Sequence, residues 1–382
     1  MLIRAIQHGQ KTVWSVLVLI CAATSSAETA GVRAFRDLAY VSNGAVRQKL
    51  DLFVPETGEG PWPVIVWVHG GAWLAGSKED CPALRQGLIQ RGYAIASIGY
   101  RLSSDALFPA QIQDCKAAVR WLRAHANTYH LDPARFGAWG SSAGGHLVAL
   151  MGTSGAVKAF DVGEHLAESS RVQAVCDYYG PTDLLQMDAH THAAARTAHD
   201  AENSPESRLI GGAIQQNQEK AVAANPITYV TADTPPFLIV HGDADPVVPH
   251  HQSELLFAAL KKVGTAVQLH TIQGAGHGQG FGGTNIEQMV VGFFDCCLKR
   301  ATAPSAIATQ TTSRASGALR DARAPARFTW KEVCRREGVS EEGRVSRAAF
   351  KGPPQIFNRM DTNHDGFLSQ EDFNDDTNRS RE

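Results

Sequence analysis

The chain has 382 residues, which is more than one small domain needs and enough for a large core with extra segments. Hydrophobic residues make up 43% and charged residues 19%, so we expect most of the chain to fold around a buried core. The formal net charge of −2 argues against a nucleic-acid partner, which would need a basic patch interleaved with aromatic side chains, and against binding to an anionic membrane.

The first 27 residues have the features of a secretory signal peptide. Arg4 and Lys11 make the start positive, and the apolar run 13–23 is too short to span a bilayer comfortably. Ser25 and Ala27 are small residues at the −3 and −1 positions of a cleavage site. We therefore expect a secreted or periplasmic protein, with an uncleaved anchor or a buried helix as the alternatives. Disulfides among the six remaining cysteines are permitted there, but their connectivity stays open.

Between residues 32 and 300, short apolar runs alternate with amphipathic stretches. The clearest helix covers 110–129, where apolar residues recur every three or four positions after Pro109. This alternation implies a mostly parallel sheet with helices on both faces, and residues 37–54 could add an antiparallel hairpin. The runs that we interpret as strands covered on both faces are 63–68, 93–98, 135–139, 172–178, 236–240 and 267–272.

The strongest motif is G-x-S-x-G at residues 140–144, which follows the strand 135–139 and precedes a helix that begins near Gly145. A serine on such a tight strand-to-helix turn is typical of a nucleophile elbow, in which flanking glycines let neighbouring backbone pack closely. Ser142 is therefore the candidate nucleophile, and it needs a base to take its proton.

Two later strand ends provide candidates for the acid and the base, in the order serine, acid, histidine. The strand 236–240 leads into HGDADPVVP at 241–249, where Asp243 and Asp245 compete for the role of the acid. The strand 267–272 leads into a glycine-rich loop that contains His277, the candidate base. The histidines at positions 190, 192 and 199 have irregular spacing, which disfavours a metal cluster there.

Residues 301–327 are rich in Ala, Thr, Ser and Pro and predict a flexible linker. Residues 328–374 follow as a small C-terminal module. In it, residues 361–372 resemble an EF-hand calcium loop with a glycine at position six. Position twelve is an aspartate where glutamate is usual, which predicts weaker calcium binding. The five predicted ligands are Asp361, Asn363, Asp365, Phe367 through its carbonyl, and Asp372.

EF-hands pair, and residues 338–349 align as a second loop. Gly338 and Ala349 occupy its positions one and twelve, so this hand should not hold calcium. We interpret it as a degenerate structural partner. Position eight is Val345 in this loop and Leu368 in the other, and Leu368 would join the short strand that pairs the two hands. The alternative is an acidic surface loop.

Residues from about 40 to 297 resemble the esterase/lipase branch of the α/β-hydrolases. More closely, they resemble bacterial carbohydrate esterases with feruloyl and acetyl-xylan esterase activity. The stretches that carry the resemblance are HGGAW at 69–73, YRLS at 100–103, FPAQIQDCKAAVRWLR at 108–123, WGSSAGGHL at 139–147, YYGPTDL at 178–184 and HGDADPVVP at 241–249.

The resemblance implies an α/β-hydrolase fold and assigns several roles. Gly71 and Ala72, with Ala143 after the serine, would provide the backbone N–H groups of an oxyanion hole. Asp245 is favoured over Asp243, because the aspartate of the family pattern HG-x-x-D-x-x-V-P falls there. Ser142, Asp245 and His277 would then form the triad of an esterase that needs no cofactor for catalysis and acts on an ester linked to a polysaccharide.

The chain also departs from the lipase relatives. Ala72 replaces their third glycine, and little chain precedes residue 60 to form their cap helices, so residues 183–212 are the candidate for a small cap. Trp73, Tyr178 and Tyr179 could line an acyl or aromatic pocket, or the tyrosines could pack the sheet edge. The alternatives are a serine peptidase of the oligopeptidase type, a general short-chain carboxylesterase and a non-catalytic binding module.

Overall fold

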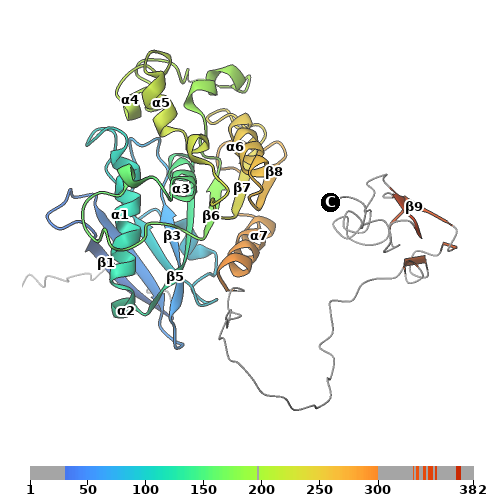
Figure 1. Cartoon of the computed structure of the whole chain (residues 1–382), viewed down its shortest axis with the longest axis horizontal. Helices are drawn as coiled ribbons and strands as arrows, with labels where there is room; N and C mark the ends of the chain where they lie inside the picture. Colours follow the sequence, from blue (N-terminus) through green and yellow to red (C-terminus); the bar gives the residue numbers. More distant parts are fainter. Residues whose placement is uncertain are drawn as a thin grey trace, which may run out of the picture. The chain divides into compact units, whose positions relative to one another are not determined.

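The computed structural model describes residues 31–195 and 198–299, and in the C-terminal part residues 330, 333–334, 339–340, 343–346, 349–350 and 367–370. The chain divides into two compact units, Met1–Pro304 and Ser305–Glu382 (Figure 1). The predicted signal peptide and the predicted linker lie outside the described residues and stay predictions. Within the described residues, no helix is both long and apolar enough to cross a membrane.

The first unit is built on one eight-stranded sheet with the order β1-β2-β4-β3-β5-β6-β7-β8. β1 pairs with β2, and β2 with β4, in antiparallel register, and the remaining neighbours are parallel. The predicted mostly parallel sheet with an N-terminal hairpin is thus confirmed. The strands are β1 (Val32–Ala39), β2 (Lys49–Pro55), β3 (Trp62–Val68), β4 (Ala94–Ile98), β5 (Leu131–Ser141), β6 (Ala174–Tyr178), β7 (Phe237–Gly242) and β8 (Val267–Ile272).

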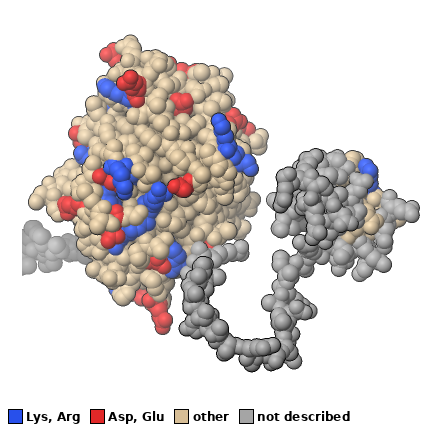
Figure 2. All heavy atoms as spheres, viewed as in Figure 1, with Lys and Arg blue, Asp and Glu red and all other residues tan. Residues whose placement is uncertain are grey.

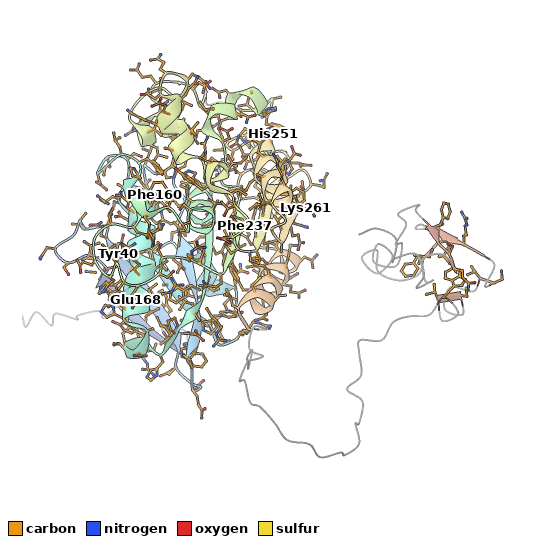
Figure 3. The ribbon with its side chains drawn as sticks, in the orientation of Figure 1. Tyr40, Phe160, Glu168, Phe237, His251 and Lys261 are labelled. Carbon is orange, nitrogen blue, oxygen red and sulfur yellow. The ribbon has the colours of Figure 1, made fainter. Side chains whose placement is uncertain are left out.

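The two faces of the sheet pack against different helices. Alternate residues of β3 divide between two hydrophobic clusters, with Val64 and Val66 in one and Ile65 and Trp67 in the other. The first cluster includes side chains of α1 (Ala110–Ala124), α3 (Ala143–Thr153) and α6 (His251–Lys262), and the second includes those of α7 (Thr284–Phe294). Both faces are therefore covered, which explains why the strand sequences are continuously apolar. Figure 3 shows Phe237 among these interior side chains.

The predicted helix 110–129 is interrupted. α1 ends at Ala124, His125 leaves the helical conformation, and α2 (Ala126–Tyr129) continues for one turn. The His125 ring stacks on Trp121, with ring centroids 4.1 Å apart, and its Nδ1 lies 2.8 Å from the Trp121 carbonyl oxygen. The imidazole thus bonds a carbonyl at the end of α1, a local contact that apolar periodicity does not reveal.

The segment between β6 and β7 forms a group of short helices at the top of Figure 1. Polar side chains anchor its ends, because Gln252 accepts hydrogen bonds from the N–H groups of Thr182 and Asp183, and Asn225 accepts one from Leu184. The segment contains η3 (Leu184–Gln186), η4 (Asp188–His190), α4 (Pro205–Ile210), η5 (Ile214–Gln216), α5 (Gln218–Ala224) and η6 (Pro226–Tyr229). Elsewhere lie η1 (Pro82–Arg85), η2 (Lys158–Phe160) and the π-helical turn η7 (Asp295–Lys299).

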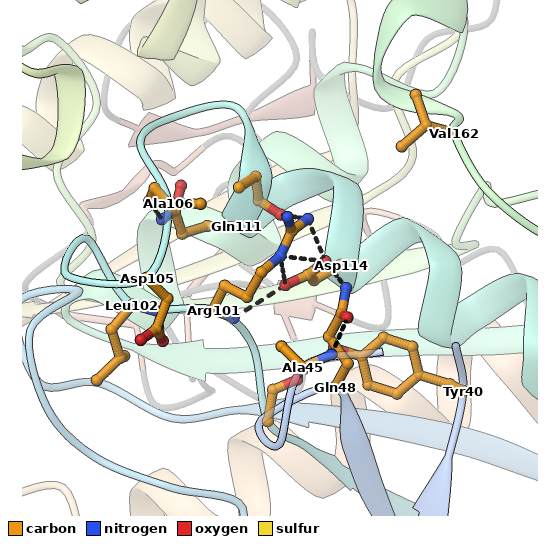
Figure 4. A network of polar contacts seen from close by, with 12 residues as sticks. Tyr40, Ala45, Gln48, Arg101, Leu102, Asp105, Ala106, Gln111, Asp114 and Val162 are labelled. Carbon is orange, nitrogen blue, oxygen red and sulfur yellow. Dashed lines mark hydrogen bonds and ion pairs between the residues drawn. The ribbon is translucent and has the colours of Figure 1, made fainter. Parts of the chain in front are cut away.

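Basic and acidic side chains are interspersed on the face shown in Figure 2, in agreement with the nearly balanced composition. One ion pair with a buried carboxylate links Arg101 to Asp114. The guanidinium of Arg101 contacts both carboxylate oxygens of Asp114 on α1, with Nη2–Oδ1 2.7 Å and Nε–Oδ2 2.9 Å (Figure 4). Asp114 also accepts from the Arg101 backbone N–H at 2.9 Å and from the Gln48 amide at 2.7 Å. This network joins the β1–β2 loop, the residues after β4 and α1.

In the second unit, β9 (Val345–Ser346) and β10 (Phe367–Leu368) pair in antiparallel register, with Leu368 opposite Val345. These two residues occupy position eight of the two loops predicted from the sequence. Both are buried, in a small cluster with Trp330 and Val333. Of the five predicted calcium ligands, Phe367 is described, and its side chain is 40% exposed. Asp361, Asn363, Asp365 and Asp372 lie outside the described residues.

Replacing Asp114 with alanine should lower the free energy of unfolding by about 3 kcal/mol, because Arg101 and Gln48 lose their shared buried acceptor. Urea denaturation followed by tryptophan fluorescence measures this change. Glu79→Ala is the control, since the Glu79 carboxylate contacts Lys78 from an exposed position and should contribute about 0–1 kcal/mol. Equal effects of the two substitutions would contradict the prediction.

Candidate active site

Ser142 lies between β5 and α3 in a strained backbone conformation, with φ +55° and ψ −121°. The turn is possible because the flanking glycines have no side chains. A Cβ on Gly144 would collide with the Val68 carbonyl oxygen, and one on Gly140 would collide with the Gly144 carbonyl. The Ser142 N–H donates to the Tyr178 carbonyl at 2.8 Å, which ties the turn to the end of β6. The strand-turn-helix predicted for G-x-S-x-G is present.

The predicted nucleophile, base and acid lie in hydrogen-bonding contact. The Ser142 Oγ is 3.0 Å from His277 Nε2, and His277 Nδ1 is 2.7 Å from Asp245 Oδ2. Because Nδ1 faces a carboxylate, it carries the ring proton, which leaves Nε2 to accept the serine hydroxyl proton. The three residues follow β5, β7 and β8, whose carboxyl ends meet at one edge of the sheet.

Asp245 is buried, and donors contact both of its oxygens. Oδ1 accepts from the N–H groups of Val247 at 2.8 Å and Val248 at 3.0 Å. Oδ2 faces His277 and, at 3.3 Å, Nε2 of His241. Burial by itself raises the pKa of Asp245, but the hydrogen bonds from His241 and His277 outweigh it and hold this pKa below its ordinary value. The carboxylate is therefore ionised at neutral pH.

The competing aspartate has a different environment. Asp243 is exposed, and its Oδ1 accepts a hydrogen bond from the Gly274 N–H at 2.6 Å. It thus joins the loop after β7 to the loop after β8. The geometry places Asp245, rather than Asp243, against the imidazole.

The HGGAW loop lies against the nucleophile turn, since a Cβ on Gly70 would stand 2.8 Å from the Ser141 carbonyl oxygen. Gly71, Ala72 and Trp73 have φ values of +112°, +56° and +55°, an uncommon run for two residues with side chains. Among the described residues, the N–H groups of Gly71 and Ala72 make no hydrogen bond. Ala143 begins α3, where N–H groups have no partner within the helix. These donors are the predicted oxyanion-hole groups.

The BD-FAE family model matches residues 50–260. The chain belongs to this family of α/β-hydrolases. BD-FAE members are carbohydrate esterases of the feruloyl and acetyl-xylan type, that is, carboxylic ester hydrolases. The family thus agrees with the resemblance inferred from the motifs.

Solved structures and curated proteins agree with the BD-FAE assignment. A structure described as a truncated carbohydrate esterase from gut microbiota has a TM-score of 0.64 and 32% identity, over 70% of this chain and 97% of that one. The bifunctional GH43-CE of Bacteroides eggerthii has a TM-score of 0.64 and 35% identity, over 69% of this chain and 35% of that one. Esterase LipQ of Mycobacterium tuberculosis is 35% identical over 206 residues, 53% of this chain and 47% of LipQ. The chain thus spans about half the length of the curated relatives it matches.

The three aromatic residues predicted for a substrate pocket of this BD-FAE chain have different surroundings. Trp73 is 1% exposed and packs edge-on to His146, and Tyr178 is 5% exposed and packs edge-on to Trp139. Both side chains belong to the hydrophobic core. Tyr179 is half-buried, and its ring lies edge-on to His277 with centroids 4.6 Å apart. Of the three, Tyr179 is the one whose side chain contacts a side chain of the triad.

The histidines between β6 and β7 make separate contacts. His199 is buried and pairs with Glu206, with Nδ1–Oε1 3.0 Å, whereas the His190 ring lies 3.6 Å from the ring of His251 between centroids. In the described parts of the chain, no group of three or more His, Cys, Asp or Glu side chains is arranged to hold a metal ion. The five cysteines Cys81, Cys115, Cys176, Cys296 and Cys297 carry free thiols.

One residue at this site was not predicted from the sequence. His241 stands four positions before Asp245 and contacts its carboxylate, whereas in the sequence it is only the first residue of the HG-x-x-D pattern. The signal was its position at the end of a buried strand, where an imidazole needs polar partners.

The burial of the His146 side chain on α3 predicts that the stability of the protein depends on pH. Its Nε2–H donates to the Ala224 carbonyl at 2.8 Å, and burial lowers its pKa from 6.5 to about 4. The unfolded imidazole therefore takes up a proton near pH 6.5, whereas the folded one stays neutral until about pH 4. The contribution of His146 to stability should fall by about 3 kcal/mol as the pH drops through this window.

Urea titrations of the wild type and His146→Gln at pH 7, 5.5 and 4 test this dependence. As the pH falls, the unfolding free energy of the wild type should decrease more than that of the variant, because glutamine does not titrate. His192→Gln, a substitution of an exposed histidine, is the control. A wild-type-minus-variant difference that stays constant from pH 7 to pH 4 would contradict the prediction.

Proposed function

We propose that this chain is a serine carboxylic ester hydrolase that removes acetyl or feruloyl groups from plant polysaccharide. The observation that carries the proposal is the chain of hydrogen bonds from Ser142 through His277 to Asp245, beside a loop with free backbone donors. Membership of the BD-FAE family and the likeness to carbohydrate esterases support the substrate class.

The geometry supports a two-step acyl transfer. His277 Nε2 takes the hydroxyl proton of Ser142 while Oγ attacks the ester carbonyl carbon. The negative charge that develops on the carbonyl oxygen is stabilised by the N–H groups of Gly71, Ala72 and Ala143, and removal of one such donor typically costs about 3 kcal/mol. Asp245 keeps the ring proton of His277 on Nδ1 and stabilises the imidazolium.

The tetrahedral intermediate then collapses. The C–O bond to the alcohol breaks, His277 returns its proton to the leaving alcohol, and the acyl group remains on Ser142. Water enters, His277 takes a proton from it, and the hydroxide attacks the acyl carbon. Collapse of the second intermediate releases the carboxylic acid and restores the serine hydroxyl.

Ser142→Ala should lower kcat on an aryl ester by about 10⁴-fold or more, because the nucleophile is lost while the binding groups remain. The measurement uses 4-nitrophenyl acetate, methyl ferulate, acetylated xylan and a proline peptide as substrates. Ser154→Ala is the control, since Ser154 is a buried serine at the C-cap of α3 whose hydroxyl donates to the Leu150 carbonyl rather than to a triad residue.

A wild-type rate in Ser142→Ala would overturn the mechanism. Cleavage of the peptide without cleavage of the esters would instead favour the oligopeptidase alternative. Cleavage of small aryl esters alone would identify a general short-chain carboxylesterase.

We also propose that the C-terminal module is an EF-hand pair with one calcium site at residues 361–372. Carboxylate, amide and carbonyl oxygens at positions one, three, five, seven and twelve are a hard-cation ligand set. The pairing of Leu368 with Val345 supports the proposal, because it aligns position eight of the two loops in a short antiparallel ribbon. Calcium would bind in this loop, and the proposed ester hydrolysis does not use it.

Isothermal calorimetry of the full chain should detect one calcium ion bound with a Kd of about 10⁻⁴ to 10⁻³ M, as in extracellular EF-hand modules. The double variant Asp361→Ala, Asp365→Ala should show no binding, because two charged ligands are lost. Glu342→Ala in the degenerate loop is the control and should bind as the wild type does. An absence of heat with millimolar calcium in the wild type would refute the site.

A further inference from the structure

His241 is a buried histidine that takes no part in the proposed acyl transfer. It lies at the end of β7 and is fully buried. Its Nε2 is 3.0 Å from the Val248 carbonyl oxygen and 3.3 Å from Asp245 Oδ2, and its Nδ1 is 2.7 Å from Ser253 Oγ. Both ring nitrogens therefore have partners, and one partner is the acid of the triad.

These contacts determine the protonation of the ring. Nε2 faces two groups that can only accept, a carbonyl and an ionised carboxylate, so it carries the proton and donates to both. Nδ1 then has a lone pair and accepts the hydroxyl proton of Ser253 on the first turn of α6. The opposite tautomer would place an unprotonated nitrogen against two acceptors in a buried site, which costs free energy.

Two other rings lie near His241 in the part of the chain that the structure describes. The His250 ring lies 5.4 Å away and the Tyr179 ring 6.2 Å away, measured between centroids. Burial lowers the pKa of His250, and burial raises the pKa of Tyr179 to about 12, so both rings are neutral at pH 7. Among the described residues, Asp245 is therefore the charged group in contact with His241.

We propose that His241 and Ser253 are positioning residues that extend the triad, so that Ser253 fixes the tautomer of His241 and His241 holds the Asp245 carboxylate in place for His277. This role rests on the proposed esterase function. Asp245 Oδ2 lies 2.7 Å from His277 Nδ1 and 3.3 Å from His241 Nε2, and Oδ1 is held by two backbone N–H groups. With four donors around it, the carboxylate has one orientation.

Loss of the His241 donor has two consequences for the reaction. The carboxylate can rotate, so His277 is held less well and kcat falls. Asp245 also becomes a stronger acceptor for the remaining donor, which favours the imidazolium form of His277. Since the enzyme needs neutral His277 as its base, the acid limb of the pH profile of kcat/KM moves to higher pH.

The test compares His241→Leu, His241→Gln and Ser253→Ala on 4-nitrophenyl acetate. His241→Leu should lower kcat about 10-fold with KM within about twofold, and it should raise the midpoint of the acid limb by about half a pH unit. His241→Gln retains an N–H near the position of Nε2 and should restore most of the rate. Ser253→Ala should act in the same direction as His241→Leu, and Ser154→Ala, which removes an equally buried hydroxyl, should not.

Proton NMR gives a readout that does not depend on substrate. The His277 Nδ1 proton bonded to a carboxylate should give a far-downfield resonance in the wild type, and this resonance should shift or broaden in Ser253→Ala. If the wild type cleaves no ester, the proposed function fails while NMR still tests the positioning role. Variants that fold but keep the wild-type kcat, acid limb and downfield resonance would overturn the inference. If His241→Leu does not fold, Ser253→Ala tests the inference instead. A lower kcat with a raised acid limb supports it, and wild-type values overturn it.

Discussion

The site depends on a close approach of backbone to backbone at the end of β5. α3 starts so near β3 that no side chain fits at Gly144, where a Cβ would strike the Val68 carbonyl. This contact holds the chain in the tight turn that gives Ser142 its positive φ. The HGGAW loop leaves β3 at the same place, so the contact that positions the serine also brings the candidate oxyanion donors beside it.

The chemistry further depends on how buried charge is compensated. The Asp245 carboxylate has four donors and Asp114 has donors from Arg101 and Gln48, so each is held in one orientation. A buried carboxylate with fewer partners would be costly or would take up a proton. Hydrogen bonds to the side chains of Gln252 and Asn225 likewise anchor the short helices between β6 and β7. Their hydrophobic side chains join the core cluster that covers one face of the sheet.

Local sequence predicted the elements of the fold with small errors at their ends. The strand 267–272 has the predicted bounds, while β5 extends beyond 135–139 to Leu131–Ser141. The helix 110–129 is interrupted at His125, whose ring stacks on Trp121 and contacts its carbonyl. Trp73 and Tyr178 could not be placed from the sequence, since an aromatic residue beside a strand end can face either a pocket or the core. Their exposure of 1% and 5% shows that they are packed in the core.

The sequence by itself determined the serine, the histidine and the alternation of strands and helices, because each depends on residues close together in the chain: a G-x-S-x-G turn after an apolar strand, a histidine in a glycine loop, and runs of defined period. Residue types left Asp243 and Asp245 as alternatives, and only family resemblance separated them. The tertiary structure alone decided that His277 contacts Asp245, that Asp243 bonds the Gly274 N–H, and that His241 and Ser253 lie behind the acid. These contacts join residues from different strands and loops, so their distances follow from sheet order and packing, which no local pattern contains.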